Sequence, residues 1–276
     1  MLQSNSLKLI LGTFVFFIIS VLLLSVYREE NTEQTENSAS LERLANRFAN
    51  NQIGIPFLIY HSVRPHITNE TAIQDAYDIT PKALDRQFEY LKNNGYHTVY
   101  PRDLVEYLNG NLRLPNKPIV ISFDDGWENQ YKYAFPLIQK YDFKAIFYIY
   151  SRPLDIGAKH FLTWSQIKEM LAAGMEIGDH TLTHPYLMRV TDPVVMRREI
   201  LGEKLELEKR LGIQIKSFAY PFGHYNNLAI SMIKSAGLTS ARTTYPGVYK
   251  SGDDLYKMKG FLTVDDFNKF LRNLKS

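Results

Sequence analysis

Short apolar runs alternate with amphipathic stretches from residue 55 to the C-terminus. Runs rich in β-branched and aromatic residues predict strands, and apolar positions with a helical period, many followed by glycine, predict helices. This alternation, repeated about seven times, favours an α/β barrel-like domain. The expected strands are residues 57–60, 98–100, 119–123, 145–150, 175–178, 217–220 and 240–244, and the expected helices are residues 81–93, 103–109, 128–140, 165–173, 193–211 and 229–236.

The N-terminal part of the chain follows another pattern. Residues 9–26 form an uncharged run of mainly Leu, Ile, Phe and Val, about 18 residues long, near the minimum that crosses a bilayer. The run has no small-residue cleavage site, which favours an uncleaved anchor over a signal peptide, and Lys8 before it gives a weak positive-inside bias. Residues 31–51 are polar and suit a stalk, with a short helix at 41–48. We therefore expect a cytoplasmic N-terminus (1–8), a transmembrane helix (9–27), a stalk (28–52) and a folded domain (53–276) outside the membrane of a single-pass protein.

Composition narrows the chemistry of the folded domain. A hydrophobic content of 45% is ample for a full core, and the net charge of +3 is small. Because no dense Lys/Arg block is interleaved with aromatic residues, nucleic acid is not an expected partner. Cysteine is absent, so any metal must be bound by histidine and carboxylate side chains.

Two short motifs carry the candidate chemistry. The apolar run 119–123 ends in Asp124 and Asp125, and His180 and His184 follow about 55 residues later. Asp-Asp-Gly alone is commonly a turn, and His-x-x-x-His alone is commonly a pair of surface histidines on a helix. Burying two carboxylates at a strand end is costly unless a metal or a charged partner compensates. The combination therefore predicts a metal-dependent hydrolase, with Asp125, His180 and His184 holding a Zn²⁺-like ion and Asp124 accepting a proton from water.

The chain also resembles a known family, the polysaccharide deacetylases of carbohydrate esterase family 4, or NodB-homology domains. Residues 122–126 (Ser-Phe-Asp-Asp-Gly) and 180–184 (His-Thr-Leu-Thr-His) are similar to the family's first two motifs. The resemblance extends from about residue 55 to the C-terminus. It implies a distorted (β/α) barrel of about seven strands, a divalent metal with Zn²⁺ as the preferred ion, and hydrolysis of N-acetyl groups on a polysaccharide.

A third segment, residues 218–223 (Phe-Ala-Tyr-Pro-Phe-Gly), resembles the family's third motif. That motif lines the substrate groove, which implies an oxyanion donor in the N–H of Phe222 and substrate contacts at Tyr220 and Pro221. Trp127, beside the first motif, is a further candidate for stacking on sugar, with packing at the barrel rim as the alternative. Ala219 stands where many members carry an arginine that supports the catalytic carboxylate, so the sequence leaves the partner of Asp124 open.

The general acid is the fourth expected element. Family members usually have a late histidine that protonates the leaving amine, but no histidine follows His224 in this chain. The apolar run 57–60 ends in His61 instead, which is similar to the arrangement in biofilm poly-β-1,6-N-acetylglucosamine deacetylases. First and last strands are neighbours in a closed barrel, so both positions can serve one site. His61 is therefore the candidate acid, with a strand-end hydrogen bond as the alternative.

The resemblance implies an enzyme that removes N-acetyl groups from an N-acetylglucosamine-containing cell-surface polysaccharide, such as poly-β-1,6-N-acetylglucosamine. Two alternatives remain. One is deacetylation of N-acetylglucosamine in peptidoglycan. The other is an inactive carbohydrate-binding or scaffolding barrel, which the missing arginine at Ala219 keeps open.

Overall fold

A computed structural model describes residues 28, 54–67 and 77–275. The chain divides into two compact units, residues 1–51 and 52–276, and the second contains nearly all of the described residues. The predicted transmembrane helix, the short helix at 41–48 and the stalk apart from residue 28 lie outside the described residues. Among the helices that are described, none combines the length and apolar character needed to cross a membrane.

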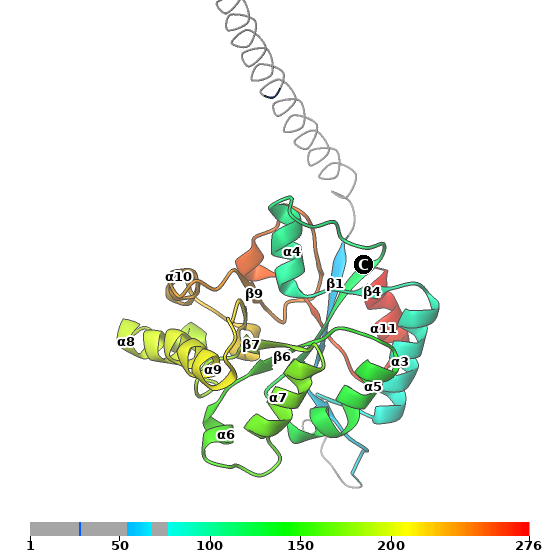
Figure 1. Cartoon of the computed structure of the whole chain (residues 1–276), viewed down its shortest axis with the longest axis horizontal. Coiled ribbons are helices and arrows are strands. Elements are labelled where there is room, and N and C mark those ends of the chain that lie inside the picture. Colours follow the sequence, from blue (N-terminus) through cyan, green and yellow to red (C-terminus); the bar gives the residue numbers. More distant parts are fainter. Residues whose placement is uncertain (1–27, 29–53, 68–76, 276) are drawn as a thin grey trace, which may run out of the picture. The chain divides into compact units, whose positions relative to one another are not determined.

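A curled sheet of nine strands forms the centre of the second unit (Figure 1). Its strands are β1 (Ile55–Tyr60), β4 (His97–Thr98), β5 (Pro118–Asp124), β6 (Ile146–Ile149), β7 (Glu176–Asp179), β8 (Ser217–Ala219), β9 (Ser240–Arg242), β10 (Val248–Tyr249) and β11 (Phe261–Leu262). Seven strands follow the path β10-β1-β5-β6-β7-β8-β9, while β11 pairs with β1 and β4 with β5. Only the β1–β10 pair in this sheet is antiparallel among the described strands. A separate parallel pair joins β2 (Ser62–Val63) and β3 (Asp78–Ile79).

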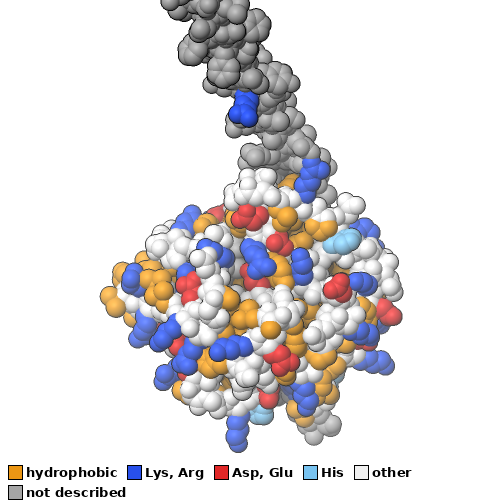
Figure 2. Space-filling model, in the orientation of Figure 1, with side chains coloured by type: hydrophobic (Ala, Val, Ile, Leu, Met, Phe, Trp, Pro, Cys, Tyr) orange, Lys and Arg blue, Asp and Glu red, His pale blue; other side chains and the backbone are white. Residues whose placement is uncertain are grey.

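Helices cover the outside of this sheet (Figure 1). The α-helices are α3 (Pro81–Asn93), α4 (Pro101–Leu108), α5 (Phe135–Lys140), α6 (Arg152–Asp155), α7 (Trp164–Ala172), α8 (Pro193–Arg197), α9 (Glu203–Leu211), α10 (Asn227–Ser235) and α11 (Phe267–Leu274). Two π-helical turns, η1 (Gln130–Ala134) and η3 (Arg198–Gly202), lead into α5 and α9, and three 3₁₀ turns are η2 (Leu187–Arg189), η4 (Pro221–Gly223) and η5 (Leu255–Lys257). Figure 2 shows that Lys and Arg side chains are spread over the face of the molecule in view, with Asp and Glu side chains among them.

The two faces of the sheet explain why its central strands read as continuous apolar runs. Every residue of β1 and β5 is buried. One face packs against the helices, and the other encloses a smaller cluster that includes Phe57, Val120 and Ile146. Parallel strands covered on both sides are expected to lack a polar face. The β5 run therefore delivers Asp124 and Asp125 directly from the core to the edge of the sheet.

The sheet is a half-barrel rather than a barrel closed by strand pairing. The described path ends at β10 on one side and β9 on the other. The segment that contains Met258 and β11 contacts the sheet near both of these edges. Met258 forms a β-bridge with Arg242 of β9, and β11 pairs with β1. The barrel expectation is thus confirmed in its α/β architecture and its seven-stranded path. The carboxyl ends of β1, β5, β7 and β8 face one rim, which is where such folds carry their sites.

The predicted helix and strand bounds agree with the structure where residues near the end of an element, such as a capping side chain or a proline, determine where it starts. The helix expected at residues 81–93 is α3, which starts with the Thr80 side chain accepting from the Ala83 N–H at 3.2 Å and with Pro81 in its first turn. The strand expected at 98–100 was too long, because Tyr100 is already the N-cap of α4 and its N–H donates to Asp103 at 2.9 Å. The predicted helices 128–140 and 193–211 each contain a π-helical turn that periodicity does not reveal. The two-residue strands β2, β3, β10 and β11 were not predicted.

Candidate active site

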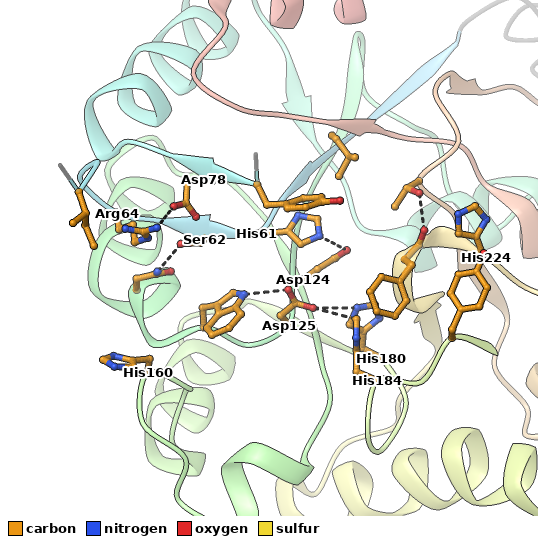
Figure 3. A pocket seen from close by; sticks show the side chains of 18 residues that line it. His61, Ser62, Arg64, Asp78, Asp124, Asp125, His160, His180, His184 and His224 are labelled. Carbon is orange, nitrogen blue, oxygen red and sulfur yellow. Dashed lines mark hydrogen bonds and ion pairs between the residues drawn. The ribbon is translucent and has the colours of Figure 1, made fainter. Parts of the chain in front are cut away.

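A cavity of about 880 Å³ opens at the rim where the parallel strands end. Figure 3 shows Asp124, Asp125, His61, His180 and His184 gathered in its middle, with Arg64 and Asp78 on one side and His224 on the other. These side chains come from segments that are far apart in sequence. The structure therefore brings together the carboxylate pair, the histidine pair and His61, as the sequence analysis expected.

Asp125, His180 and His184 present their donor atoms to one point. Asp125 Oδ1 lies 3.5 Å from His180 Nε2 and 3.4 Å from His184 Nε2, and the three ligand atoms lie within 4.8 Å of one another. Bonds of about 2.0–2.1 Å in tetrahedral geometry place neighbouring ligand atoms roughly 3.4 Å apart. A carboxylate and two imidazoles also suit Zn²⁺ and related divalent ions. The residues present fit a bound metal.

Neighbouring groups orient these donors. His180 Nδ1 is 2.7 Å from the carbonyl oxygen of Ala219, which leaves Nε2 directed at the cluster. The loop between the two histidines is held by buried Glu199, whose carboxylate accepts from the N–H and hydroxyl of Thr183 at 2.9 and 3.0 Å. The His184 N–H donates to Thr181 Oγ1 at 3.0 Å. The second histidine is thus positioned by a folded loop and not by a helix face.

The charge states suit metal binding. Burial tends to raise the pKa of Asp125, yet the contact with His180 and the charges of the neighbouring imidazoles hold it well below its usual range. Burial and the neighbouring His180 lower the pKa of His184 to about 4. Asp125 is therefore an anion and His184 a neutral ligand near neutral pH, which is the protonation state that metal binding requires.

Three site residues have a left-handed backbone although none is glycine. The φ angles are 76° at Asp125, 59° at His184 and 60° at Phe222. Non-glycine residues in this region typically cost about 1–3 kcal/mol each and persist where surrounding structure holds them. Their concentration at one cavity indicates that the backbone is shaped for the site rather than for folding alone.

Arg242 is the partner of Asp124 that the sequence left open. Its Nη2 donates to both carboxylate oxygens of Asp124, at 2.5 and 2.6 Å, and the arginine is fully buried. In the β8–β9 ladder, Ala219 and Arg242 are register partners. The guanidinium that many family members place at the Ala219 position thus reaches the carboxylate from the adjacent strand.

The buried arginine has a defined support. Its guanidinium lies 5.2 Å from the ring centre of Tyr148, whose hydroxyl is 2.7 Å from Ser217 Oγ. Gly178 provides the space for that ring, because a β-carbon there would overlap it. The cation–π contact and the hydrogen bond fix Tyr148, and through it Arg242, on the inner face of the half-barrel.

His61 lies beside the carboxylate of Asp124. Its Nε2 is 3.7 Å from Asp124 Oδ2, at the end of β1. Buried Gln130 links the two strand ends, since its Nε2 donates to the carbonyl oxygens of His61 at 2.8 Å and of Asp124 at 2.5 Å. Gln130 belongs to the π-helical turn η1, a feature that often marks functional sites.

The predicted substrate contacts have different positions. Trp127 lines the cavity, donates from Nε1 to Asp125 Oδ2 at 3.1 Å and stacks on Phe161. Phe222 also lines it, and its ring lies 4.6 Å from that of His184. Tyr220 and Pro221 are buried away from the lining, and the Tyr220 hydroxyl donates to the Tyr256 carbonyl oxygen at 3.0 Å. The structure thus places Tyr220 and Pro221 behind the lining of the cavity, and the substrate contact expected from their motif stays a prediction.

Sequence reasoning missed Arg242 and Gln130. Arg242 lies in an ordinary Ser-Ala-Arg strand, so only the register of β9 on β8 reveals its role. Gln130 lies on a helix expected from periodicity, but the hydrogen bonds that matter depend on the π-helical turn. A buried polar residue on an apolar helix face was the one available signal for Gln130.

Comparisons with known proteins agree with this site. The chain matches the polysaccharide deacetylase family over residues 111–241. A Bacillus subtilis protein assigned to the polysaccharide deacetylases is 28% identical over 204 residues, which cover 74% of this chain and 69% of the relative. A poly-β-1,6-N-acetyl-D-glucosamine N-deacetylase of Staphylococcus aureus is 26% identical over 211 residues, covering 71% of each chain. The structure of a Streptococcus pyogenes deacetylase in complex with acetate has a TM-score of 0.74 at 26% identity, over 81% of this chain and 99% of that one.

Fold and site together define a hydrolase of the NodB type, with its chemistry at the carboxyl rim of an α/β half-barrel. Residues 111–241 match the polysaccharide deacetylase family, and the relatives and structural neighbours indicate that the chain is a deacetylase. An inactive scaffold, which the alanine at position 219 had kept open, is not supported, because Arg242 supplies the missing guanidinium.

Substitutions at Arg242 and Ala219 test whether Arg242 orients the Asp124 carboxylate. Replacing Arg242 with leucine is expected to lower kcat about 100-fold or more, because Asp124 loses the contact that orients it, with little change in KM or metal content. Breaking a buried ion pair also costs about 3–5 kcal/mol, so the unfolding temperature should fall. In the double variant Ala219→Arg/Arg242→Ala the guanidinium returns to the neighbouring strand, and part of kcat should recover. Acetate release is the measurement, and equal kcat values for the Leu variant and the parent would exclude a role for Arg242.

Proposed function

We propose that this chain removes N-acetyl groups from poly-β-1,6-N-acetylglucosamine or a closely related exopolysaccharide, in a metal-dependent reaction. The observation that carries the proposal is His61 at 3.7 Å from Asp124, beside the Asp125-His180-His184 cluster. The candidate general acid follows the first strand of the domain, which resembles the arrangement in the biofilm deacetylases. The Staphylococcus aureus relative, which bears that activity in its name, supports the same substrate class.

The residues at the cavity have separate roles in the proposed amide hydrolysis. A divalent ion at the cluster supplies polarisation of the acetamide carbonyl and of an attacking water. Asp124 accepts the proton of that water as its oxygen bonds to the carbonyl carbon, and Arg242 keeps the carboxylate aimed at it. The N–H of Phe222 donates to the carbonyl oxygen as negative charge develops there. His61 donates a proton to the nitrogen as the C–N bond breaks, so that acetate and a free amino sugar leave.

Acetate release tests this proposal directly. The full chain is assayed on defined β-1,6-linked N-acetylglucosamine oligomers, on β-1,4-linked oligomers and on peptidoglycan fragments, each with and without a chelator. We expect release from the β-1,6-linked series, its loss with chelator and its return when Zn²⁺ is added. Preferential release from peptidoglycan fragments would replace the substrate assignment, and chelator-resistant release would remove the metal from the mechanism.

The acid role of His61 predicts a dependence on the leaving group. His61→Ala is expected to lower kcat on N-acetylated oligomers by about 10²–10⁴-fold, because the amine nitrogen must be protonated as it departs. Hydrolysis of an aryl acetate should fall less than about tenfold, since a phenolate leaves without a proton. The two rates are measured on one preparation of each variant. A uniform loss on both substrates would reduce His61 to a structural residue.

We also propose a membrane-tethered placement for the enzyme, with residues 9–27 as the anchor and the catalytic domain outside. The uncharged apolar composition of residues 9–26 supports it. Such a placement suits a surface polysaccharide substrate. Protease treatment of intact cells tests the orientation, because a catalytic domain on the cytoplasmic side of the membrane would be protected from cleavage.

A further inference from the structure

A row of aromatic rings leads outward from the metal-type cluster on one side of the cavity. The ring of His184 lies 4.6 Å from Phe222, and Phe222 lies 5.8 Å from Tyr186. The row continues from Tyr186 to His224 at 5.4 Å and from His224 to Tyr245 at 5.7 Å. We call Tyr186, Phe222, His224 and Tyr245 the aromatic strip. Three of its members line the cavity itself, so the strip is continuous with the site.

The strip exposes apolar surface that folding does not require. Phe222 is 55% exposed and Tyr245 is 40% exposed, although burial of an aromatic ring generally stabilises a folded protein. Phe222 also has the left-handed backbone described above. A strained turn that presents an apolar ring to solvent is typical of a binding surface.

The rings are fixed in position before any ligand arrives. The Thr244 hydroxyl donates to the Phe222 carbonyl oxygen at 3.2 Å, and Gly223 lets the turn approach Thr244, because a β-carbon would overlap that side chain. His224 Nδ1 is 3.3 Å from the Tyr245 hydroxyl. A preformed surface of this kind needs little ordering on binding.

The opposite side of the cavity differs in character. There Arg64 and buried Asp78 form an ion pair, and Ser62 and Asn129 are hydrogen-bonded at 2.8 Å (Figure 3). Rings also occur elsewhere along the cavity, where Trp127 stacks on Phe161 at 4.6 Å and Tyr77 lies 5.1 Å from His61. Among the described lining residues, Tyr186, Phe222 and His224 form a succession of ring faces with hydroxyl and imidazole groups at their edges. A pyranose ring has the same mixture of apolar C–H faces and polar edges, and rigid amphipathic rings suit such a ligand.

We propose that the aromatic strip is a subsite for the sugar residue next to the one that is deacetylated. This inference rests on the proposed function and adds to it a direction for the polymer, from the Arg64 side across the cluster to the strip. Binding of the neighbouring sugar is used to hold the reacting acetamide in place. The enzyme therefore acts on residues within a chain in preference to isolated sugars.

The test compares substrates of different length in the full chain. For the parent, kcat/KM for acetate release should rise from the N-acetylglucosamine monomer to the β-1,6-linked pentamer. In Tyr186→Ala the pentamer-to-monomer ratio of kcat/KM should fall about tenfold, as expected for the loss of one well-placed aromatic contact. Tyr186→Phe keeps the ring and is the matched control, with most of the ratio retained. Tyr245→Ala, on another segment, should lower the ratio as well.

The outcomes separate the two proposals. An unchanged ratio in both alanine variants would overturn the subsite while leaving the proposed function intact. No acetate release by the parent from any β-1,6-linked oligomer would overturn the proposed substrate, and the subsite with it. A ratio lowered by Tyr186→Ala and retained by Tyr186→Phe, with unchanged unfolding temperatures, supports the strip.

Discussion

Replacing Asp124 with asparagine is expected to stop acetate release while the metal stays bound. The side chain is assigned proton transfer, and it lies outside the Asp125-His180-His184 cluster. Asparagine keeps the shape of the side chain but cannot accept the proton of the attacking water. Loss of a general base typically costs about 10²–10⁴-fold in rate. Single-turnover acetate release and elemental analysis of the same preparation measure both properties.

The stability of this variant needs a control, because Asp124 is also the partner of the buried Arg242. Asp85→Asn serves as one, since it removes a carboxylate that pairs with Lys140 at 2.7 Å on the outer surface. That variant should keep the parent's rate and metal content. Loss of metal from Asp124→Asn would show that the roles of Asp124 and Asp125 are reversed.

Replacing His184 with alanine is expected to remove both metal and activity. The cluster has three protein donors within 4.8 Å of one another, and loss of one leaves two, too few for a tight catalytic site. Metal content should fall from about one ion per chain towards zero, and acetate release should fall at least about 100-fold. Elemental analysis and the acetate assay on purified full chain measure the change.

His97→Ala is the matched control for this ligand test. His97 lies on β4, and its Nδ1 is 2.8 Å from the carbonyl oxygen of Asn116, away from the cavity. It should retain both metal and rate. Unchanged metal content in His184→Ala would exclude His184 from the ligand set and leave the cluster geometry unexplained.

The sequence determined those parts of the site that rest on local pattern. The apolar run before Asp124 and Asp125 predicted a strand that delivers two carboxylates to a rim, and the structure has both in the cavity. His61 was predicted in the same way, from a run that ends in a histidine. The spacing of His180 and His184 indicated a shared site, although a folded loop, and not a helix, brings them together.

Other parts depend on contacts that no local pattern encodes. Arg242 reaches Asp124 only because β9 pairs with β8 in the register that places it beside Ala219. A shift of one residue would turn the guanidinium to the other face of the sheet. Tyr220 was expected at the groove from its motif, but the turn after β8 directs its hydroxyl to Tyr256. Register and turn geometry are tertiary properties, which explains both differences.

The left-handed backbone at Asp125, His184 and Phe222 also affects how this enzyme would respond to selection for heat resistance. Glycine adopts such φ angles without steric cost, and asparagine tolerates them better than most residues. Screening for thermal tolerance alone would therefore favour glycine or asparagine at these positions, and each such gain would remove a proposed metal ligand or a side chain that lines the cavity. Laboratory evolution of a hardier enzyme from this chain must hold these three positions constant and seek its improvements on the outer helices.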